Sequence, residues 1–271
     1  MSGYDVFISL LPLAVFYGLV ILSFIVFSLI IYPRRPKSQE VLDKMHPTFV
    51  GVLFREWWYW LNNPFIILFT KLKFTPNNLT GISLVLGLVS GYFFYRGDFA
   101  LAGWLLIVSG TLDILDGRLA RVTNQSTNEG AFFDSCADRF AEAAVFMGLT
   151  LYFLEARQIT CFGEKTYFYL CFACIAALSG SELVSYTKAR AEAIGVTTKM
   201  GLMQRPERVA SLAFIAVLHP FFSIVLKAQG LEPHYPLIII LILMAVLTNY
   251  TAVARMIILY RGIKKKYSQN A

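Results

Sequence analysis

"TLDILDGRLARVTNQSTNEGAFFDSCADRF", residues 111–140, places four carboxylates in a short polar stretch between two apolar runs. They belong to Asp113, Asp116, Asp134 and Asp138. The first two are three residues apart and the last two are four apart, so each pair is expected to lie on one face of its helix. A hairpin through the residues between the pairs would bring the two faces together.

Apolar runs flank this stretch and recur along the chain. The 271-residue sequence is 57% hydrophobic and only 15% charged, whereas soluble domains are about one quarter charged. A helix needs about 20 apolar residues to cross the hydrocarbon core of a bilayer, and the runs do not alternate with the period of two that a β-barrel requires. An all-α integral membrane fold is therefore expected. Its seven predicted spans cover residues 7–32, 76–95, 99–122, 130–154, 166–190, 208–227 and 236–260.

The chain is predicted to consist of a six-span domain and a preceding part. The first apolar run lacks both a basic start and a small-residue cleavage site, so we expect it to be retained rather than removed as a signal peptide. After it, residues 46–64 combine three of the four tryptophans with Arg55 and Glu56, which is typical of a helix at the membrane interface. The predicted parts are an extra N-terminal transmembrane helix at 1–32, a cytoplasmic linker with an interfacial amphipathic helix at 33–64, the six-span domain at 65–260 and a basic cytoplasmic tail at 261–271.

Lysine and arginine are distributed unevenly between the predicted loops. They gather between the first and second spans, after the fifth span and at the C-terminal end, whereas the opposite loops carry only Arg96, Arg157, Lys165 and Lys227. Positively charged loops remain on the cytoplasmic side. We therefore expect the N-terminus outside, the C-terminus inside, and the four-Asp segment at the cytoplasmic face of the cytoplasmic (inner) membrane.

Four neighbouring carboxylates repel one another unless protons or cations neutralise them. Oxygen ligands without His or Cys favour Mg²⁺ or Mn²⁺ over zinc, and two such ions are a common device for displacement at phosphorus. Gly117 and Gly130 leave room for a ligand against the backbone, and Arg121 is positioned to neutralise a diphosphate. The competing interpretation, a salt-bridge network of the carboxylates with Arg118, Arg121 and Arg139, leaves both glycines without a use.

The pattern D-x2-D-G-x2-A-R-x8-G-x3-D-x3-D resembles the signature of the CDP-alcohol phosphotransferase family. The resemblance covers roughly residues 65–260 and leaves the helix before residue 33 outside. All eight signature positions are matched, by Asp113, Asp116, Gly117, Ala120, Arg121, Gly130, Asp134 and Asp138.

The resemblance implies a six-helix membrane enzyme, usually a homodimer, with a polar cavity open to the cytoplasm. It implies that Asp113, Asp116 and Asp134 bind two divalent ions, and that Asp138 both contributes to the metal site and deprotonates the acceptor hydroxyl. The alcohol oxygen then attacks the phosphorus nearest the lipid of CDP-diacylglycerol, and CMP departs. The residues implied to line the nucleotide and diphosphate pocket are Gly117, Ala120, Arg121 and Gly130.

The acceptor alcohol is indicated by a second set of polar residues. Ser185 and Lys188 lie on one helical stripe, Arg208 is near the start of the next span, and Arg255 follows an uncharged run in the last. Such a cluster is typical of an anion pocket for a phosphorylated acceptor. The segments "SYTKARAE" and "RPER" also resemble the phosphatidylinositol-phosphate synthase branch, which implies that these four residues hold inositol 1-phosphate.

Three alternatives stay open. The basic residues could be markers of topology only; the acceptor could be glycerol 3-phosphate, serine or another alcohol; or the carboxylates could form the cation site of a transporter. A transporter would be expected to carry charges near mid-membrane in several spans, for which Glu142 and Glu182 are the only hints. The expected partners are membrane lipids and a second copy of the chain, with no nucleic acid.

Overall fold

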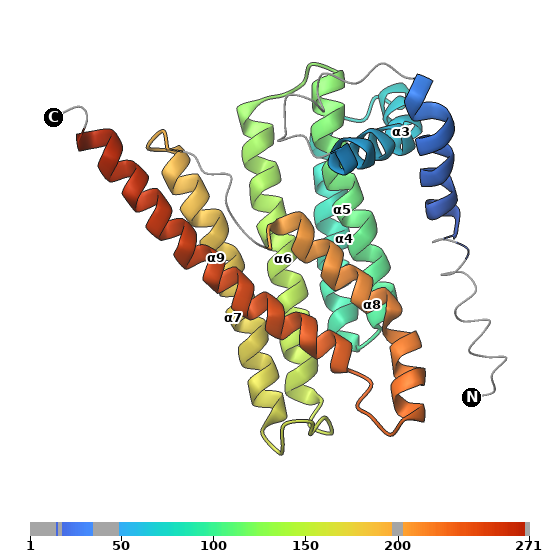
Figure 1. Ribbon diagram of the computed structural model, residues 1–271, viewed down its shortest axis with the longest axis vertical. Coiled ribbons are helices and arrows are strands. Elements are labelled where there is room, and N and C mark those ends of the chain that lie inside the picture. The colour runs from blue at the N-terminus through green and yellow to red at the C-terminus, as the bar shows by residue number, and fades with distance from the viewer. Residues whose placement is uncertain (1–14, 16–17, 35–48, 197–202, 269–271) are drawn as a thin grey trace. The chain divides into compact units, whose positions relative to one another are not determined.

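The computed structural model describes residues 15, 18–34, 49–196 and 203–268, and within these residues it is helical, without a named strand (Figure 1). The all-α prediction is thus confirmed. The N-terminal helical segment Gly18–Arg34 ends in a π-helical turn, η1 (Phe27–Ile31), and a 3₁₀ turn, η2 (Tyr32–Arg34). The long helices are α3 (Phe49–Lys71), α4 (Pro76–Arg96), α5 (Phe99–Val122), α6 (Asn128–Glu155), α7 (Thr166–Glu192), α8 (Arg205–Ala228) and α9 (Tyr235–Ser268).

Helices α4 to α9 coincide closely with the six predicted core spans. Among the described residues, five helices are long and apolar enough to cross a membrane: α4, α5, α7, α8 and α9 as far as Lys264. Helix α6 is not one of them, and it carries the carboxylates of Asp134, Asp138 and Glu142 within its first 15 residues. Of the predicted span at 7–32, the structure describes Gly18–Arg34 as helical, and residues 1–14, 16 and 17 lie outside the described part.

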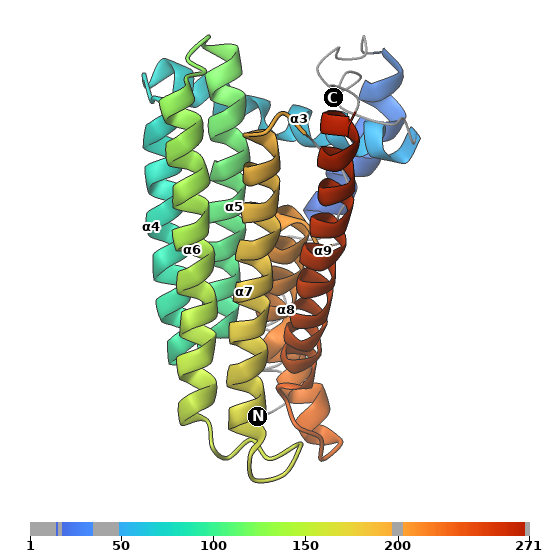
Figure 2. The same ribbon diagram turned by 90° about the vertical axis from the view of Figure 1, so that its left-hand side faces the viewer.

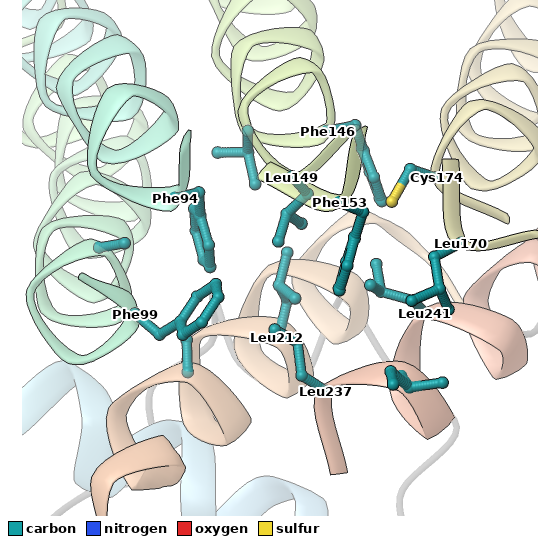
Figure 3. Close-up of a cluster of buried hydrophobic side chains, with 14 of the residues drawn as sticks. Phe94, Phe99, Phe146, Leu149, Phe153, Leu170, Cys174, Leu212, Leu237 and Leu241 are labelled. Carbon is teal, nitrogen blue, oxygen red and sulfur yellow. The ribbon is translucent and has the colours of Figure 1, made fainter. Parts of the chain in front are cut away.

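The chain forms two compact units. One contains the described residues up to Thr75 together with Arg118–Gln125, and the other contains Pro76–Gly117 and the described residues from Ser126 onward. In the second unit, α4, α5, α6 and α7 run side by side (Figures 1 and 2). Its core is a cluster of buried apolar side chains from α4 to α9 (Figure 3), including Phe94, Phe99, Leu149, Phe153, Leu170, Leu212, Leu237 and Leu241.

Two glycines allow α4 and α6 to pack with their backbones in contact. A Cβ atom added to Gly148 would overlap the carbonyl group of Gly91, and one added to Gly91 would overlap the carbonyl of Ala144. Small residues at helix interfaces permit this approach within membranes. The register of α4 against α6 is therefore fixed, and α6 carries half of the carboxylates.

The helix predicted to lie at the membrane interface differs from the prediction at its C-terminal end. Helix α3 begins at Phe49, passes through Pro64 and continues to Lys71, so the predicted end at Pro64 is wrong. A proline within a helix removes one backbone hydrogen bond and tends to kink or end it, but here the apolar residues that follow extend the helix. Of these, Phe65, Ile67 and Leu68 are about half exposed, at 50%, 48% and 48%.

Candidate active site

Helices α5 and α6 present the four signature carboxylates. Asp113 and Asp116 lie in the C-terminal half of α5, and Asp134 and Asp138 lie in the second and third turns of α6. Helix α6 starts where it does because Thr127 caps it: the Thr127 side chain accepts a hydrogen bond of 3.0 Å from the backbone N–H of Gly130. Asp134 and Asp138 follow this cap by about two and three turns, which places them on one face of α6.

Three of the four carboxylates converge, as the spacing predicted. Each of Asp113, Asp116 and Asp134 offers an oxygen, and these oxygens lie within 4.8 Å of one another. Asp116 is only 4% exposed, and its Oδ2 accepts a 2.5 Å hydrogen bond from the hydroxyl of Thr80 on α4. Oδ1 of Asp134 is buried and has no hydrogen-bond partner. A buried carboxylate oxygen without a donor, beside two further carboxylates, suits a hard divalent cation.

The fourth carboxylate is linked to the cluster by an arginine. Nη1 of Arg205 lies 2.9 Å from Oδ2 of Asp113 and 2.5 Å from Oδ2 of Asp138. Arg205 is the first residue of α8, whose start is fixed by a capping box in which the side chains of Gln204 and Glu207 each accept a bond from the other's backbone. The guanidinium thus supplies positive charge directly at the carboxylates.

Sequence reasoning assigned no role to Arg205 or Thr80. For Arg205 a signal existed, because it precedes Arg208 by three residues and so lies near the same face at the start of a span. For Thr80 there was none, since its contact with Asp116 depends on how α4 packs against α5.

The predicted nucleotide-pocket residues are distributed over both units. A Cβ atom added to Gly130 would lie 3.2 Å from Oδ1 of Asn77 on α4, so this glycine keeps the first turns of α4 and α6 close together. Gly117 is partly buried on α5. Ala120 and Arg121 lie in the last turn of α5, in the first unit, where Ala120 is partly buried and Arg121 is exposed.

The structure gives Arg208 a partner that the sequence did not indicate. The side chain is 2% exposed, with Nε 2.7 Å from Oε1 and Nη2 2.9 Å from Oε2 of Glu142. Its Nη1 donates to the carbonyl of Met203 at 2.9 Å, and the hydroxyl of Ser181 donates to Oε1 of Glu142 at 3.0 Å. The guanidinium is therefore held in a bidentate ion pair between α8 and α6.

The other predicted acceptor residues gather at the C-terminal end of α7. Arg255, on α9, is 5% exposed and donates a 2.9 Å hydrogen bond to the carbonyl of Val184, the residue before Ser185. Lys188 is exposed, with its ammonium 3.9 Å from the carboxylate of Glu192. Arg255 is buried against a partner, as expected of an arginine within an apolar run.

Comparison with known proteins identifies the family. The sequence profile of CDP-alcohol phosphatidyltransferases matches residues 73–263, which is more than half of the chain. The chain belongs to this family. It is similar to the archaetidylinositol phosphate synthase of Pyrococcus horikoshii, with 37% identity over 149 residues that make up 55% of this chain and 71% of the relative. It is also similar to the phosphatidylinositol phosphate synthase of Mycobacteroides abscessus, with 33% identity over 181 residues, 64% of this chain and 76% of the relative.

Solved structures of the family have the same fold. The Mycobacterium tuberculosis phosphatidylinositol phosphate synthase with CDP-DAG bound superposes with a TM-score of 0.61 at 26% identity, covering 73% of this chain and 92% of that chain. The same enzyme in complex with manganese and citrate gives a TM-score of 0.62 at 26% identity, over 73% and 88% of the two chains.

The family assignment makes this chain an integral membrane transferase, and it favours a transferase over the cation transporter considered as an alternative. Together with the converging oxygens of Asp113, Asp116 and Asp134, it identifies the carboxylate cluster as a divalent-cation site.

Proposed function

We propose that this enzyme transfers the phosphatidyl group of CDP-diacylglycerol to the hydroxyl of inositol 1-phosphate, which yields phosphatidylinositol phosphate and CMP. The observation that carries the proposal is the oxygen cluster of Asp113, Asp116 and Asp134, formed by signature positions in a fold shared with a phosphatidylinositol phosphate synthase that binds CDP-DAG. The relatives named are inositol phosphate lipid synthases, which favours this acceptor over glycerol 3-phosphate or serine.

We further propose that Asp113, Asp116 and Asp134, with Asp138, hold two ions of Mg²⁺ or Mn²⁺. The buried, unpartnered oxygen of Asp134 and the absence of His and Cys from the cluster support hard cations. When bound, such ions would stabilise the charge that develops on the diphosphate as CMP leaves.

We assign the remaining steps of substrate binding and reaction to individual side chains. Asp138 would accept the proton of the acceptor hydroxyl, whose oxygen then forms the bond to the lipid phosphorus as the bond to CMP breaks. Arg205, which contacts Asp138 and Asp113, balances negative charge at that point. Arg121 would neutralise the diphosphate of the donor. Gly117, Ala120 and Gly130 would line the nucleotide pocket.

We assign the acceptor phosphate to the end of α7. The contact of Arg255 with the carbonyl next to Ser185 supports a basic site there, to which Lys188 would add a second charge. Direct contact of Arg208 with the acceptor remains a prediction, because its described partners are Glu142 and Met203. We propose, as a division of the chain by role, an extra helix at 1–32, a linker at 33–64, a catalytic domain at 65–260 and a tail at 261–271, although α3 and α9 run across the limits at 64 and 260. We also propose a homodimer in the inner membrane.

An acceptor panel tests this assignment. Purified enzyme with CDP-diacylglycerol and Mg²⁺ is expected to release CMP fastest with inositol 1-phosphate, because a phosphate dianion gains charge-assisted bonds that a neutral alcohol cannot make. Release is measured with free inositol, serine and glycerol 3-phosphate in parallel. A preference for free inositol or serine would contradict the anion pocket, whereas a preference for glycerol 3-phosphate would leave the pocket and change the acceptor.

The orientation of the active site is tested by labelling. Single cysteines at Gln125, in the turn after α5, and at Glu164, before α7, are placed in a background without the four native cysteines. Both positions are exposed, and the predicted topology puts Gln125 in the cytoplasm and Glu164 outside. A membrane-impermeant thiol reagent added to intact cells should label only the cysteine at 164. Labelling at 125 under these conditions would reverse the orientation.

A further inference from the structure

Arg118 lies near the C-terminal end of α5, between Gly117 and Ala120 of the signature, and has no assigned function; its side chain is bonded to residues of α3. Nη1 donates a 2.6 Å hydrogen bond to the carbonyl of Tyr59, and Nη2 donates one of 3.1 Å to Oδ1 of Asn63. The guanidinium carbon also lies 4.9 Å from the centre of the Tyr59 ring. With only 9% of the residue exposed, the group is fixed by two directed bonds and a cation–π contact.

Helix α3 is itself packed against the N-terminal helix. Nε1 of Trp57 donates a 3.2 Å hydrogen bond to the hydroxyl of Ser23, and the edge of one ring meets the face of the other between Trp57 and Phe24, at 5.3 Å. Phe27 is fully buried, with its ring 5.5 Å from that of Trp60. Aromatic pairs of this geometry each add about 0.5–1.5 kcal/mol beyond the burial of their area. The N-terminal helix therefore supports the face of α3 next to Tyr59.

These contacts belong to one compact unit, which also contains Arg121. The unit joins the described residues up to Thr75 to the stretch Arg118–Gln125. Apart from residues 73–75, its N-terminal part lies before residue 73, where the match to the family begins. A segment outside the family region thus packs against the last turn of the helix that carries the signature.

The last turn of α5 needs such support. The carbonyl groups at a helix end lack intrahelical partners, and a terminal turn opens easily unless it is held. Here Asn124 adopts a left-handed conformation, with φ of 54°, and the N–H of Gln125 donates to the carbonyl of Ala120 at 2.8 Å. This cap closes the backbone after Arg121, while Arg118 ties the same turn to α3.

We propose that Arg118 is a positioning residue for the donor substrate. By fixing the last turn of α5 to α3, and through Trp57 to the N-terminal helix, it holds Arg121 where the diphosphate of CDP-diacylglycerol binds. The inference rests on the proposed function, because the diphosphate role of Arg121 belongs to that proposal. Arg118 acts through Arg121 and does not touch the substrate itself.

Steady-state kinetics of Arg118→Ala test the proposal. We expect the KM for CDP-diacylglycerol to rise about tenfold, within the range of indirect couplings, while kcat and the KM for inositol 1-phosphate stay within about twofold of wild type. Arg118→Lys should recover part of the loss, because an ammonium can still reach the Tyr59 carbonyl. The matched control is Arg96→Ala, which removes an exposed arginine from the end of α4. A fall in kcat and in both affinities together would reduce Arg118 to a purely structural role and overturn the proposal.

The link to the N-terminal helix is tested by a double-mutant cycle. Trp57→Phe removes the bond to Ser23 and keeps a ring, and Trp57→Ala removes both. Each Trp57 variant should raise the KM for CDP-diacylglycerol. Neither rise should add fully to the rise caused by Arg118→Ala, because Trp57 and Arg118 belong to one connection between the N-terminal helix and α5. Phe65→Ala, at a half-exposed position of α3, is the control. Fully additive effects would contradict a shared connection.

A spin label separates failure of this inference from failure of the proposed function. A nitroxide on a single cysteine at Gln125, an exposed position just after the turn, should become more mobile in Arg118→Ala without any substrate present. If wild type does not consume CDP-diacylglycerol, the proposed function fails, whatever the label shows. If wild type consumes it while label mobility and KM are unchanged in Arg118→Ala, only the positioning role fails.

Discussion

Replacement of Asp113 or Asp134 by asparagine is expected to lower the rate of CMP release by about a thousandfold or more, while the protein stays folded and extractable. The substitution keeps the shape of the side chain and removes the charge that attracts a divalent ion. Removal of one group that stabilises transition-state charge typically costs 10²–10³-fold in rate, and here a ligand of the ion itself is lost. The oxygens concerned lie within 4.8 Å of one another, so each substitution affects the whole cluster.

Three measurements accompany this prediction: CMP release, the melting temperature, and Mn²⁺ binding followed by electron paramagnetic resonance. Asp98→Asn is a suitable control, because Asp98 is exposed in the turn between α4 and α5. Binding of Mn²⁺ should weaken in both site variants and remain unchanged in the control. Substantial turnover by wild type in the presence of EDTA would show that the carboxylates have another task.

Replacement of Glu142 by Leu is expected to destabilise the protein strongly. It would leave the guanidinium of Arg208 buried, at 2% exposure, without its bidentate partner. Breaking a buried ion pair on one side typically costs about 3–5 kcal/mol, whereas replacing both partners with apolar residues is often neutral. The double variant Glu142→Leu with Arg208→Met should therefore recover most of the lost stability. Thermal unfolding in detergent measures both effects.

A matched comparison is available on α7. The pair of Lys188 and Glu192 is exposed, with N and O 3.9 Å apart, and exposed pairs contribute about 0–1 kcal/mol. Glu192→Gln should therefore leave the melting temperature nearly unchanged. Equal decreases in melting temperature for Glu142→Leu and Glu192→Gln would show that the buried pair contributes no more to stability than the exposed pair.

The same double variant decides whether Arg208 also binds the acceptor. If it does, the stable double variant should still show a KM for inositol 1-phosphate raised about ten- to a hundredfold, the equivalent of a lost hydrogen bond to a charged group. A wild-type KM would assign Arg208 to the support of the helix bundle alone. Positive charge from α8 would then reach the site through Arg205, whose guanidinium contacts Asp113 and Asp138.

The sequence predicted most of the fold because long apolar runs locate membrane helices well. Helices α4 to α9 begin and end close to the expected residues, except that α9 continues through the basic tail to Ser268. The carboxylate cluster was predictable too, since spacings of three and four fix a helix face and one short turn joins the two helices. The end of α3 could not be predicted, because a proline often ends a helix, whereas α3 continues past Pro64 through the apolar residues that follow.

Contacts between helices distant in the sequence could not be predicted in the same way. The bonds from Thr80 to Asp116, Arg205 to Asp138 and Arg208 to Glu142 each depend on which helices are neighbours. Periodicity shows which face of a helix is polar, and it carries no information about the partner of that face. For this reason Arg208 was assigned to a ligand pocket, while the structure places a glutamate against it.

The backbone contact at Gly91 and Gly148 has a consequence for how the enzyme responds to its bilayer. Helices meet a change in membrane thickness by tilting, and flexible side chains at an interface would let two helices tilt by different amounts. Where carbonyl groups and Cα atoms are in direct contact, α4 and α6 tilt as one body. Asp134 on α6 and Thr80 on α4 are then expected to keep their separation in thin and thick membranes alike.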